Sequence, residues 1–214
     1  DWVIESPSEL TPILESHKPM QVIVSSVAAE ASDWTALVKA ERLIVLSSST
    51  TLPFKNHYKT KSTLGLDRLA ALAGAEKINP GKNNLVIDIG SCITYDLLDK
   101  SNNYHGGIIS PGIDLRFKAM NDYTKRLPLI TKYENPNLIG VSTEEAMTSG
   151  VINGITAELD GIISQYQTKW PDLEVIMCGR GLNCFESKLK AHIFASPKLV
   201  LIGLNRILEY NEQS

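Results

Sequence analysis

The stretch Leu85-Val86-Ile87-Asp88-Ile89-Gly90-Ser91 decides the fold of this chain. A short run of apolar, largely β-branched residues predicts a buried strand, and Gly90 with Ser91 predicts a tight turn at its end. Residues 94–98 predict a second strand that pairs back onto the first. After a turn at 100–103, residues 104–109 predict a third strand. The three strands together form a predicted β-meander.

Outside the meander, predicted strands and helices alternate, which is typical of an α/β protein. The predicted strands are residues 21–24, 43–46, 174–178 and 199–202, and the predicted helices are residues 8–16, 32–40, 67–77, 113–123, 142–166 and 203–210. The turn Asn79-Pro80-Gly81-Lys82 is the best candidate for an internal boundary. It divides the chain into residues 1–80 and residues 81–214.

The longest predicted helix carries two local signals. Ser142 as N-cap and Glu145 three residues later form a capping box. Gly150, Gly154 and Gly161 lie on one stripe of this helix, and each glycine costs about 1 kcal/mol of helix stability. The stripe predicts a close approach of another backbone, with local flexibility as the alternative.

Composition excludes several classes of protein. The 214 residues carry a formal charge of −3, with 43% hydrophobic residues, so the chain is an ordinary globular protein rather than a disordered one. No apolar run reaches the roughly 18 residues of a membrane helix. The acidic balance argues against a nucleic-acid partner. The cysteines Cys92, Cys178 and Cys184 have no metal spacing, so we expect reduced thiols in a cytoplasmic protein.

The turn after Asp88 is the first candidate for chemistry. The strand delivers a carboxylate, and the amides of Gly90 and the hydroxyl of Ser91 face outward from the turn. Such turn amides suit phosphate oxygens, and the carboxylate can hold an accompanying cation. Thr94 and Asp96 add polar groups on the paired strand. The alternative is a plain hairpin corner.

A second candidate lies at the start of the predicted helix at 67–77, where Asp67 and Arg68 follow Gly65 and Leu66. Asp67 can act as a general base beside an anion-binding Arg68, or it can simply favour the helix N-terminus. The glycine-rich stretches 106–112 and 179–181 are either ligand-binding loops or sharp turns. The sequence contains no P-loop, no Gly-x-Ser-x-Gly elbow and no His-Glu-x-x-His motif.

Taken in order, these segments resemble a type III pantothenate kinase of the actin-like ATPase superfamily. The matching stretches are Tyr58-Lys59-Thr60, Thr63-Leu64-Gly65-Leu66-Asp67-Arg68-Leu69-Ala70, Ile87-Asp88-Ile89-Gly90-Ser91 with Thr94-Tyr95-Asp96, Gly106-Gly107-Ile108-Ile109-Ser110-Pro111-Gly112, Leu127-Pro128, Ser142-Thr143-Glu144-Glu145-Ala146 and Pro197-Lys198-Leu199-Val200-Leu201-Ile202-Gly203-Leu204. The resemblance implies an actin-like (ribonuclease H-like) duplicated fold of two α/β halves. It also implies a phosphotransferase with an alcohol acceptor, which phosphorylates pantothenate with ATP in the first step of coenzyme A synthesis.

The resemblance assigns a role to each matching residue. Asp67 would be the general base, and Arg68 would face the carboxylate of pantothenate. Gly65, Leu66 and Tyr58 would complete the pantothenate site. Thr143 would reach the pantothenate bound to the neighbouring subunit of a homodimer.

The second phosphate motif of the family implies the ATP site. Asp88 would bind a monovalent cation, K⁺ or NH₄⁺, while Mg²⁺ would accompany ATP. Gly90 and Ser91 would contact ATP, and Ser91 stands where the family usually has Thr. The hydroxyl group is therefore retained.

The chain departs from the family at its beginning. The family opens with a strand and an Asp-x-Gly-Asn-Thr turn, and nothing like it precedes Asp67. We therefore expect the first half to lack its opening hairpin, and the chain as given to be inactive by itself. Two alternatives stay open: a non-catalytic paralogue with a regulatory or interaction role, and an actin-like kinase for another small hydroxy substrate.

Overall fold

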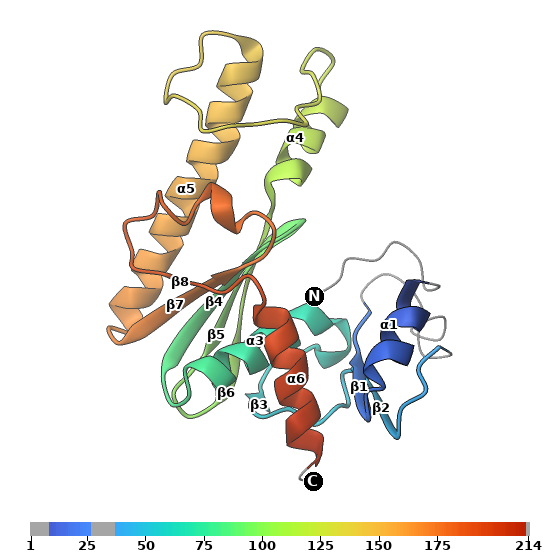
Figure 1. Ribbon diagram of the computed structural model, residues 1–214. Helices are drawn as coiled ribbons and strands as arrows, with labels where there is room; N and C mark the ends of the chain where they lie inside the picture. Colours follow the sequence, from blue (N-terminus) through green and yellow to red (C-terminus); the bar gives the residue numbers. More distant parts are fainter. Residues whose placement is uncertain (1–8, 27–36, 213–214) are drawn as a thin grey trace.

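The computed structural model describes residues 9–26 and 37–212 as an α/β protein. Its elements are α1 (Leu10–His17), β1 (Gln21–Val24), β2 (Arg42–Val45), β3 (Lys55–Asn56), the 3₁₀ helix η2 (Lys61–Thr63), α3 (Leu66–Ile78), β4 (Asn83–Ile89), β5 (Cys92–Leu98), β6 (Asn103–Pro111), α4 (Ile113–Asp122), α5 (Thr143–Lys169), β7 (Leu173–Cys178), the 3₁₀ helix η3 (Leu182–Cys184), β8 (Phe194–Ala195) and α6 (Leu199–Glu212). Figure 1 shows their arrangement.

A six-stranded sheet organises the chain, with the strand order β3-β6-β5-β4-β7-β8. Strands β4, β5 and β6 are antiparallel neighbours, which confirms the predicted meander. Strand β7 lies parallel to β4, and β8 lies parallel to β7. The parallel pair β1-β2 forms a separate small sheet. Because β4 and β7 are parallel, their carboxyl ends meet at the same edge, where α/β sheets commonly bind ligands.

The central strands bury both faces. Leu85, Ile87 and Ile89 of β4 point into a core shared with α4 and α5. Val86 points the other way, into a second core shared with α3 and α6. This alternation follows from the two-residue period of a strand. It places Asp88 and Asp96, which have the parity of Val86 in the β4–β5 pairing, on the α3 face of the sheet.

Helices α3 and α6 pack on each other through two glycines. A Cβ on Gly203 would lie within 1.6 Å of the carbonyl oxygen of Ala70, and one on Gly74 would lie 2.4 Å from that of Leu199. This contact explains why the predicted strand at 199–202 is wrong. Leu199, Gly203 and Ile207 are buried at helical spacing against α3, so tertiary packing overrides the β-branched composition.

The other predicted elements differ from the observed ones mainly at their ends. Residues 32–36 of the predicted helix at 32–40 lie outside the described residues, and residues 37–40 are not helical. The capping box is confirmed, because the Glu145 amide donates to the Ser142 hydroxyl at 3.2 Å. The Glu145 carboxylate accepts from the Val141 amide, one residue before the N-cap.

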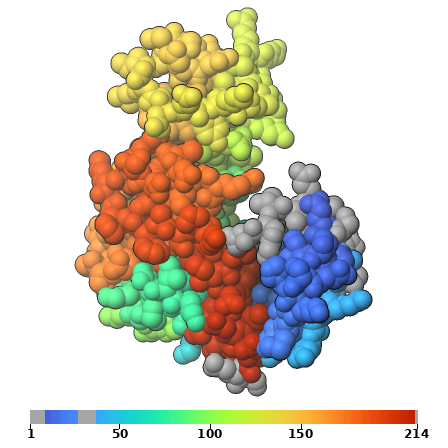
Figure 2. Space-filling model, in the orientation of Figure 1, coloured from blue at the N-terminus to red at the C-terminus, as the bar shows by residue number. Residues whose placement is uncertain are grey.

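The N-terminal part of α5 projects away from the sheet together with α4 and the segment that joins them (Figure 1). Figure 2 shows this projection, in yellow, standing clear of the remaining surface. Among the described residues, no helix is both long and apolar enough to span a membrane. The three cysteines are free, as expected. The division at residue 80 stays a prediction.

Candidate active site at the carboxyl end of strand β4

Asp88 is a partly buried carboxylate near the end of β4. It pairs with Thr94 across the hairpin, and a Cβ on Gly179 would lie only 2.3 Å from its Oδ1. Burial, together with the negative charges of Asp67 and Asp96, raises the pKa of Asp88 to about 6. No described residue donates a hydrogen bond to this carboxylate. The site therefore concentrates negative charge that a cation would relieve.

Arg68 is held in place by a buried carboxylate. Its Nε donates to Oδ2 of Asp96 at 2.9 Å, and its Nη2 donates to Oδ1 at 2.5 Å. Tyr104 joins both partners, because it accepts from Arg68 at 3.0 Å and donates to Asp96 at 2.7 Å. Asp96 and Arg68 are only 2% and 7% exposed. This bidentate pair fixes the guanidinium and leaves Nη1 as its remaining donor nitrogen.

The aromatic ring of Tyr58 lies over this pair. It stacks on Tyr104, with ring centroids 6.0 Å apart, and the guanidinium carbon of Arg68 lies 5.5 Å from its centroid. Gly106 lies against the ring, where an added Cβ would make an ordinary contact at 3.6 Å, and its φ of +98° is what favours glycine. The predicted substrate residues Tyr58 and Arg68 thus lie close together, although Tyr58 follows β3 and Arg68 belongs to α3.

Asp67 stands at the open side of the same cluster. It is exposed, in the first turn of α3, and its Oδ1 accepts from the Arg68 amide at 2.9 Å. A Cβ on Gly65, the N-cap, would lie 2.4 Å from that oxygen, so a larger residue there would displace the Asp67 carboxylate. Leu66 begins the helix. The stretch from Gly65 to Arg68 therefore places one carboxylate toward solvent and one guanidinium toward the interior.

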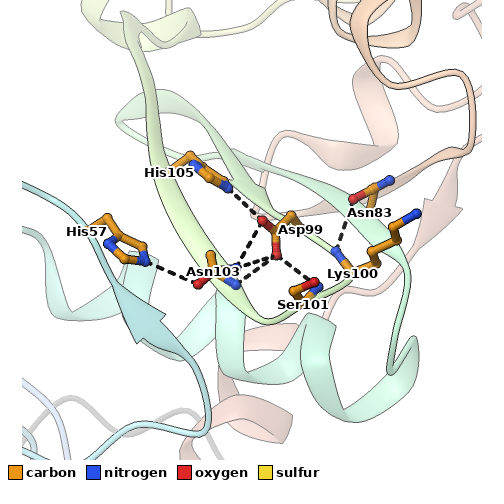
Figure 3. Close-up of polar contacts among 7 residues, drawn as sticks. All are labelled: His57, Asn83, Asp99, Lys100, Ser101, Asn103 and His105. Carbon is orange, nitrogen blue, oxygen red and sulfur yellow. Dashed lines mark hydrogen bonds and ion pairs between the residues drawn. The ribbon is translucent and has the colours of Figure 1, made fainter.

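A polar network beside the strand edge supports Tyr58. The carboxylate of Asp99 accepts from the amides of Ser101 and Asn103, each at 2.9 Å, and contacts His105 Nε2 at 2.7 Å (Figure 3). Partial burial acts to raise the pKa of Asp99, but these hydrogen bonds outweigh it and lower the pKa to about 2. The side chain of Asn103 in turn contacts His57, the residue before Tyr58, at 3.1 Å. The network fixes the start of β6 and the chain that leads into Tyr58.

The Gly90–Ser91 turn is pinned by the residues that follow β6. The Gly112 amide donates to the Ser91 carbonyl at 3.0 Å, and a Cβ on Gly112 would collide with the turn. Arg116 braces this contact, because its Nε donates to the Pro111 carbonyl at 2.8 Å. The Arg116 side chain also forms an ion pair with Glu158 on α5. Contacts with Gly112 therefore fix the backbone of the turn, while Ser91 itself is exposed.

A cavity of about 170 Å³ opens beside this turn. It is lined by Ile89, Gly90, Ser91, Ile113, Asp114, Tyr133, Arg180, Gly181 and Cys184. An adjoining cavity of about 440 Å³ shares Tyr133 and Cys184 with it. The smaller cavity has the size of part of a ligand rather than of a whole one, since ligand pockets typically enclose about 300–1,000 Å³. It joins two of the sequence candidates, the Asp88 turn and the 179–181 stretch.

Thr143 lies apart from this cluster. It is the exposed first residue of α5, at the far end of the projection from α3 (Figure 1). The sequence assigned no role to Tyr104 and did not pair Asp96 with Arg68, while it left the 179–181 stretch open as a ligand-binding loop or a sharp turn. The predicted hairpin could have placed Asp96 on the face of Asp88, because their positions differ by an even number across the turn. The contact of Asp96 with Arg68 depends on helix packing.

The donor set at Asp88 bears on the expected cations. Within the described parts of the chain, no three His, Cys, Asp or Glu side chains are arranged to hold a metal ion. A tight divalent cage of side chains is thus not formed there. Asp88 is a partly buried carboxylate with turn carbonyls and hydroxyls nearby, so the ligands on offer at this point are oxygen atoms.

Comparison with known proteins identifies relatives. A family model described as type III pantothenate kinase matches residues 7–165. A type III pantothenate kinase of Christiangramia forsetii is 48% identical over 191 residues, covering 89% of this chain and 79% of the relative. One from Phocaeicola vulgatus is 44% identical over 207 residues, covering 94% and 85%. The crystal structure of a conserved Baf family protein from Campylobacter jejuni aligns with a TM-score of 0.55 at 24% identity, covering 80% of this chain and 74% of that one.

Proposed function

The chain belongs to the type III pantothenate kinase family, with its α/β actin-like fold, and from this premise we propose that it transfers the γ-phosphate of ATP to the hydroxyl of pantothenate. The observation that carries the proposal is the convergence of Tyr58, Asp67, Arg68 and Asp88 on one side of the sheet. This reaction opens coenzyme A synthesis. A non-catalytic role does not require such a cluster.

The residues of the cluster have complementary roles. Phosphoryl transfer depends mainly on positioning and on charge neutralisation. Asp67 is exposed beside the cluster, so its carboxylate accepts the proton of the pantothenate hydroxyl as the oxygen attacks the γ-phosphorus. Arg68 offers Nη1 to the pantothenate carboxylate while Asp96 fixes the other nitrogens. Tyr58, Gly65 and Leu66 shape the pocket around the substrate.

The ATP side of the site rests on Gly90 and Ser91, whose turn faces the 170 Å³ cavity. Turn amides and a hydroxyl suit phosphate oxygens. Asp88 is the residue that would hold K⁺ or NH₄⁺, and Mg²⁺ would accompany ATP. Such cations offset the charge of the triphosphate, which a chain of net charge −3 cannot do by its overall field.

A coupled assay of the full-length protein tests the activity. ADP release should depend on pantothenate and on a monovalent cation. ATP turnover that is the same with and without pantothenate would contradict the proposal. Replacing pantothenate with other small hydroxy acids in the same assay tests the alternative of another substrate.

Replacing Asp88 with Asn should change stability as well as activity. The folded-state pKa lies above the ordinary value, so the Asp88 contribution to stability is complete below pH 3.8 and is lost as the pH rises through about 6. At pH 8, Asp88→Asn should therefore be more stable than the wild type by up to about 3 kcal/mol, at about 1.4 kcal/mol per pKa unit. The difference should vanish toward pH 4, as measured by urea unfolding.

Cation binding is tested on the same pair of proteins. Potassium chloride, compared with choline chloride at equal ionic strength, should stabilise the wild type at pH 8 and leave Asp88→Asn unchanged, because a ligand stabilises only the state that binds it. Equal stabilisation of both proteins would contradict the assignment of Asp88.

We further propose a homodimer in which Thr143 serves the neighbouring subunit. Thr143 lies far from the α3 cluster of its own chain, and exposed apolar residues precede it: Leu138, Ile139 and Val141 are 81%, 78% and 88% exposed. Gly150, Gly154 and Gly161 on α5 are exposed, and no described atom lies within 4 Å of a Cβ added to any of them. We therefore propose that the backbone predicted to approach this stripe closely belongs to a second copy of the chain.

Gly154→Leu should convert the dimer to a monomer, because a side chain there would separate the two α5 helices. Sedimentation velocity measures the change. Gln167→Leu, which adds an apolar side chain at an exposed position of α5 away from the stripe, is the matched control. An unchanged sedimentation coefficient in Gly154→Leu would exclude this face as the interface.

A further inference from the structure

Arg180 is a cation in the cavity beside the phosphate-binding turn. Among the described residues that line this cavity, two are charged, Asp114 and Arg180. The side chain of Asp114 accepts from Tyr133 at 3.3 Å, and Asp88 lies just behind the turn. Without Arg180, the groups around the turn would present negative charge to any incoming phosphate.

The backbone of Arg180 is fixed by its two glycine neighbours. Gly179 has a φ of +91°, and a Cβ there would meet Oδ1 of Asp88 at 2.3 Å. On the other side, the Gly181 amide donates to the Ile89 carbonyl at 2.9 Å. Only glycine tolerates both the positive φ and the close approach. Strand β4, which carries Asp88 and leads into the turn, therefore also determines the backbone position of Arg180.

The guanidinium of Arg180 has no ion-pair partner among the described residues, and the residue is exposed. The arginines nearest to the functional network are engaged: Arg68 pairs with Asp96, and Arg116 pairs with Glu158. An arginine beside a phosphate-binding turn can form two parallel charge-assisted hydrogen bonds with phosphate oxygens. No described carboxylate pairs with Arg180, so its guanidinium can form these bonds with a phosphate.

We propose that Arg180 binds the phosphate chain of ATP in the cavity that it lines together with the Gly90–Ser91 turn. The inference rests on the proposed kinase activity, and it adds a residue of this chain to the nucleotide site. Arg180 contributes the positive charge that the turn itself lacks. It also orients the triphosphate, since the backbone on either side of Arg180 is held against the end of β4.

Arg180→Gln should raise the KM for ATP by about 10- to 100-fold, the loss expected for hydrogen bonds to a charged group. The KM for pantothenate should change less than twofold. Arg180→Lys should show an intermediate loss, because it keeps the charge but not the fork. Arg126→Gln, at an exposed arginine outside the cavity, is the control for a lost surface charge. An unchanged KM for ATP in Arg180→Gln would overturn the proposal.

Calorimetry separates this proposal from the activity itself. Arg180→Gln should weaken the binding of a non-hydrolysable ATP analogue by the same factor and leave the binding of adenosine unchanged. An equal loss for both ligands would overturn the phosphate contact. If the wild type binds nucleotide but does not phosphorylate pantothenate, the kinase proposal fails, while the comparison of the two ligands still decides on Arg180.

Discussion

Asp67→Asn is expected to lower kcat by about 10²- to 10⁴-fold, the usual contribution of a positioned general base. Asparagine has nearly the same shape and retains Oδ1, so it can still accept the hydrogen bond from the Arg68 amide at the start of α3. What it loses is the ability to accept the proton of the substrate hydroxyl. The KM for pantothenate should change little, because Tyr58 and Arg68 remain in place.

Steady-state kinetics at saturating ATP and pantothenate measure this effect. Asp122→Asn, at an exposed aspartate at the end of α4, controls for the loss of one surface carboxylate. Circular dichroism should show the same fold for both variants. A kcat of Asp67→Asn within tenfold of the wild type would remove Asp67 as the base and leave the cluster without one.

Asp96→Asn is expected to cost about 3–5 kcal/mol of unfolding free energy, as is typical when one partner of a buried ion pair is removed. The substitution leaves the guanidinium of Arg68 buried and uncompensated, since Asp96 is 2% exposed and accepts two of its hydrogen bonds. Urea unfolding measures the loss. Because Arg68 would also lose its fixed orientation, the KM for pantothenate should rise together with the loss of stability.

A double-mutant cycle tests whether this loss of stability comes from the Arg68–Asp96 pair. Combining Asp96→Asn with Arg68→Met should recover part of the lost stability, because no charge is then left buried. Glu209→Gln, which breaks the exposed pair of Glu209 with Lys77, is the matched control and should cost less than about 1 kcal/mol. Additive effects of the two substitutions at the buried pair would contradict a coupled Arg68–Asp96 unit.

The sheet was the most predictable part of the fold. A run of β-branched residues that ends in Gly90 and Ser91 specifies a strand and a turn by local chemistry alone. The same holds for the N-terminus of α5, where Ser142 and Glu145 satisfy amides that the helix leaves free. The start of α6 was predicted wrongly, because only its contact with α3 through Gly74 and Gly203 makes residues 199–202 helical.

The site was predictable as a set of residues and not as a set of contacts. Asp67, Arg68 and Asp88 stand in recognisable motifs. The partner of Arg68 is 28 positions away, and it depends on how α3 lies on the sheet. The sequence leaves the 179–181 stretch open as a ligand-binding loop or a sharp turn, because the cavity beside Arg180 is closed by residues of β4, α4 and η3 together.

The central claim is that this cluster phosphorylates pantothenate, and the mass of the product tests it most directly. Pantothenate incubated with the full-length protein, ATP, Mg²⁺ and K⁺ should gain one phosphoryl group at its hydroxyl, as mass spectrometry can detect, with an equal amount of ADP formed. Asp67→Asn under the same conditions should form far less product. Unmodified pantothenate with the wild-type protein would contradict the account.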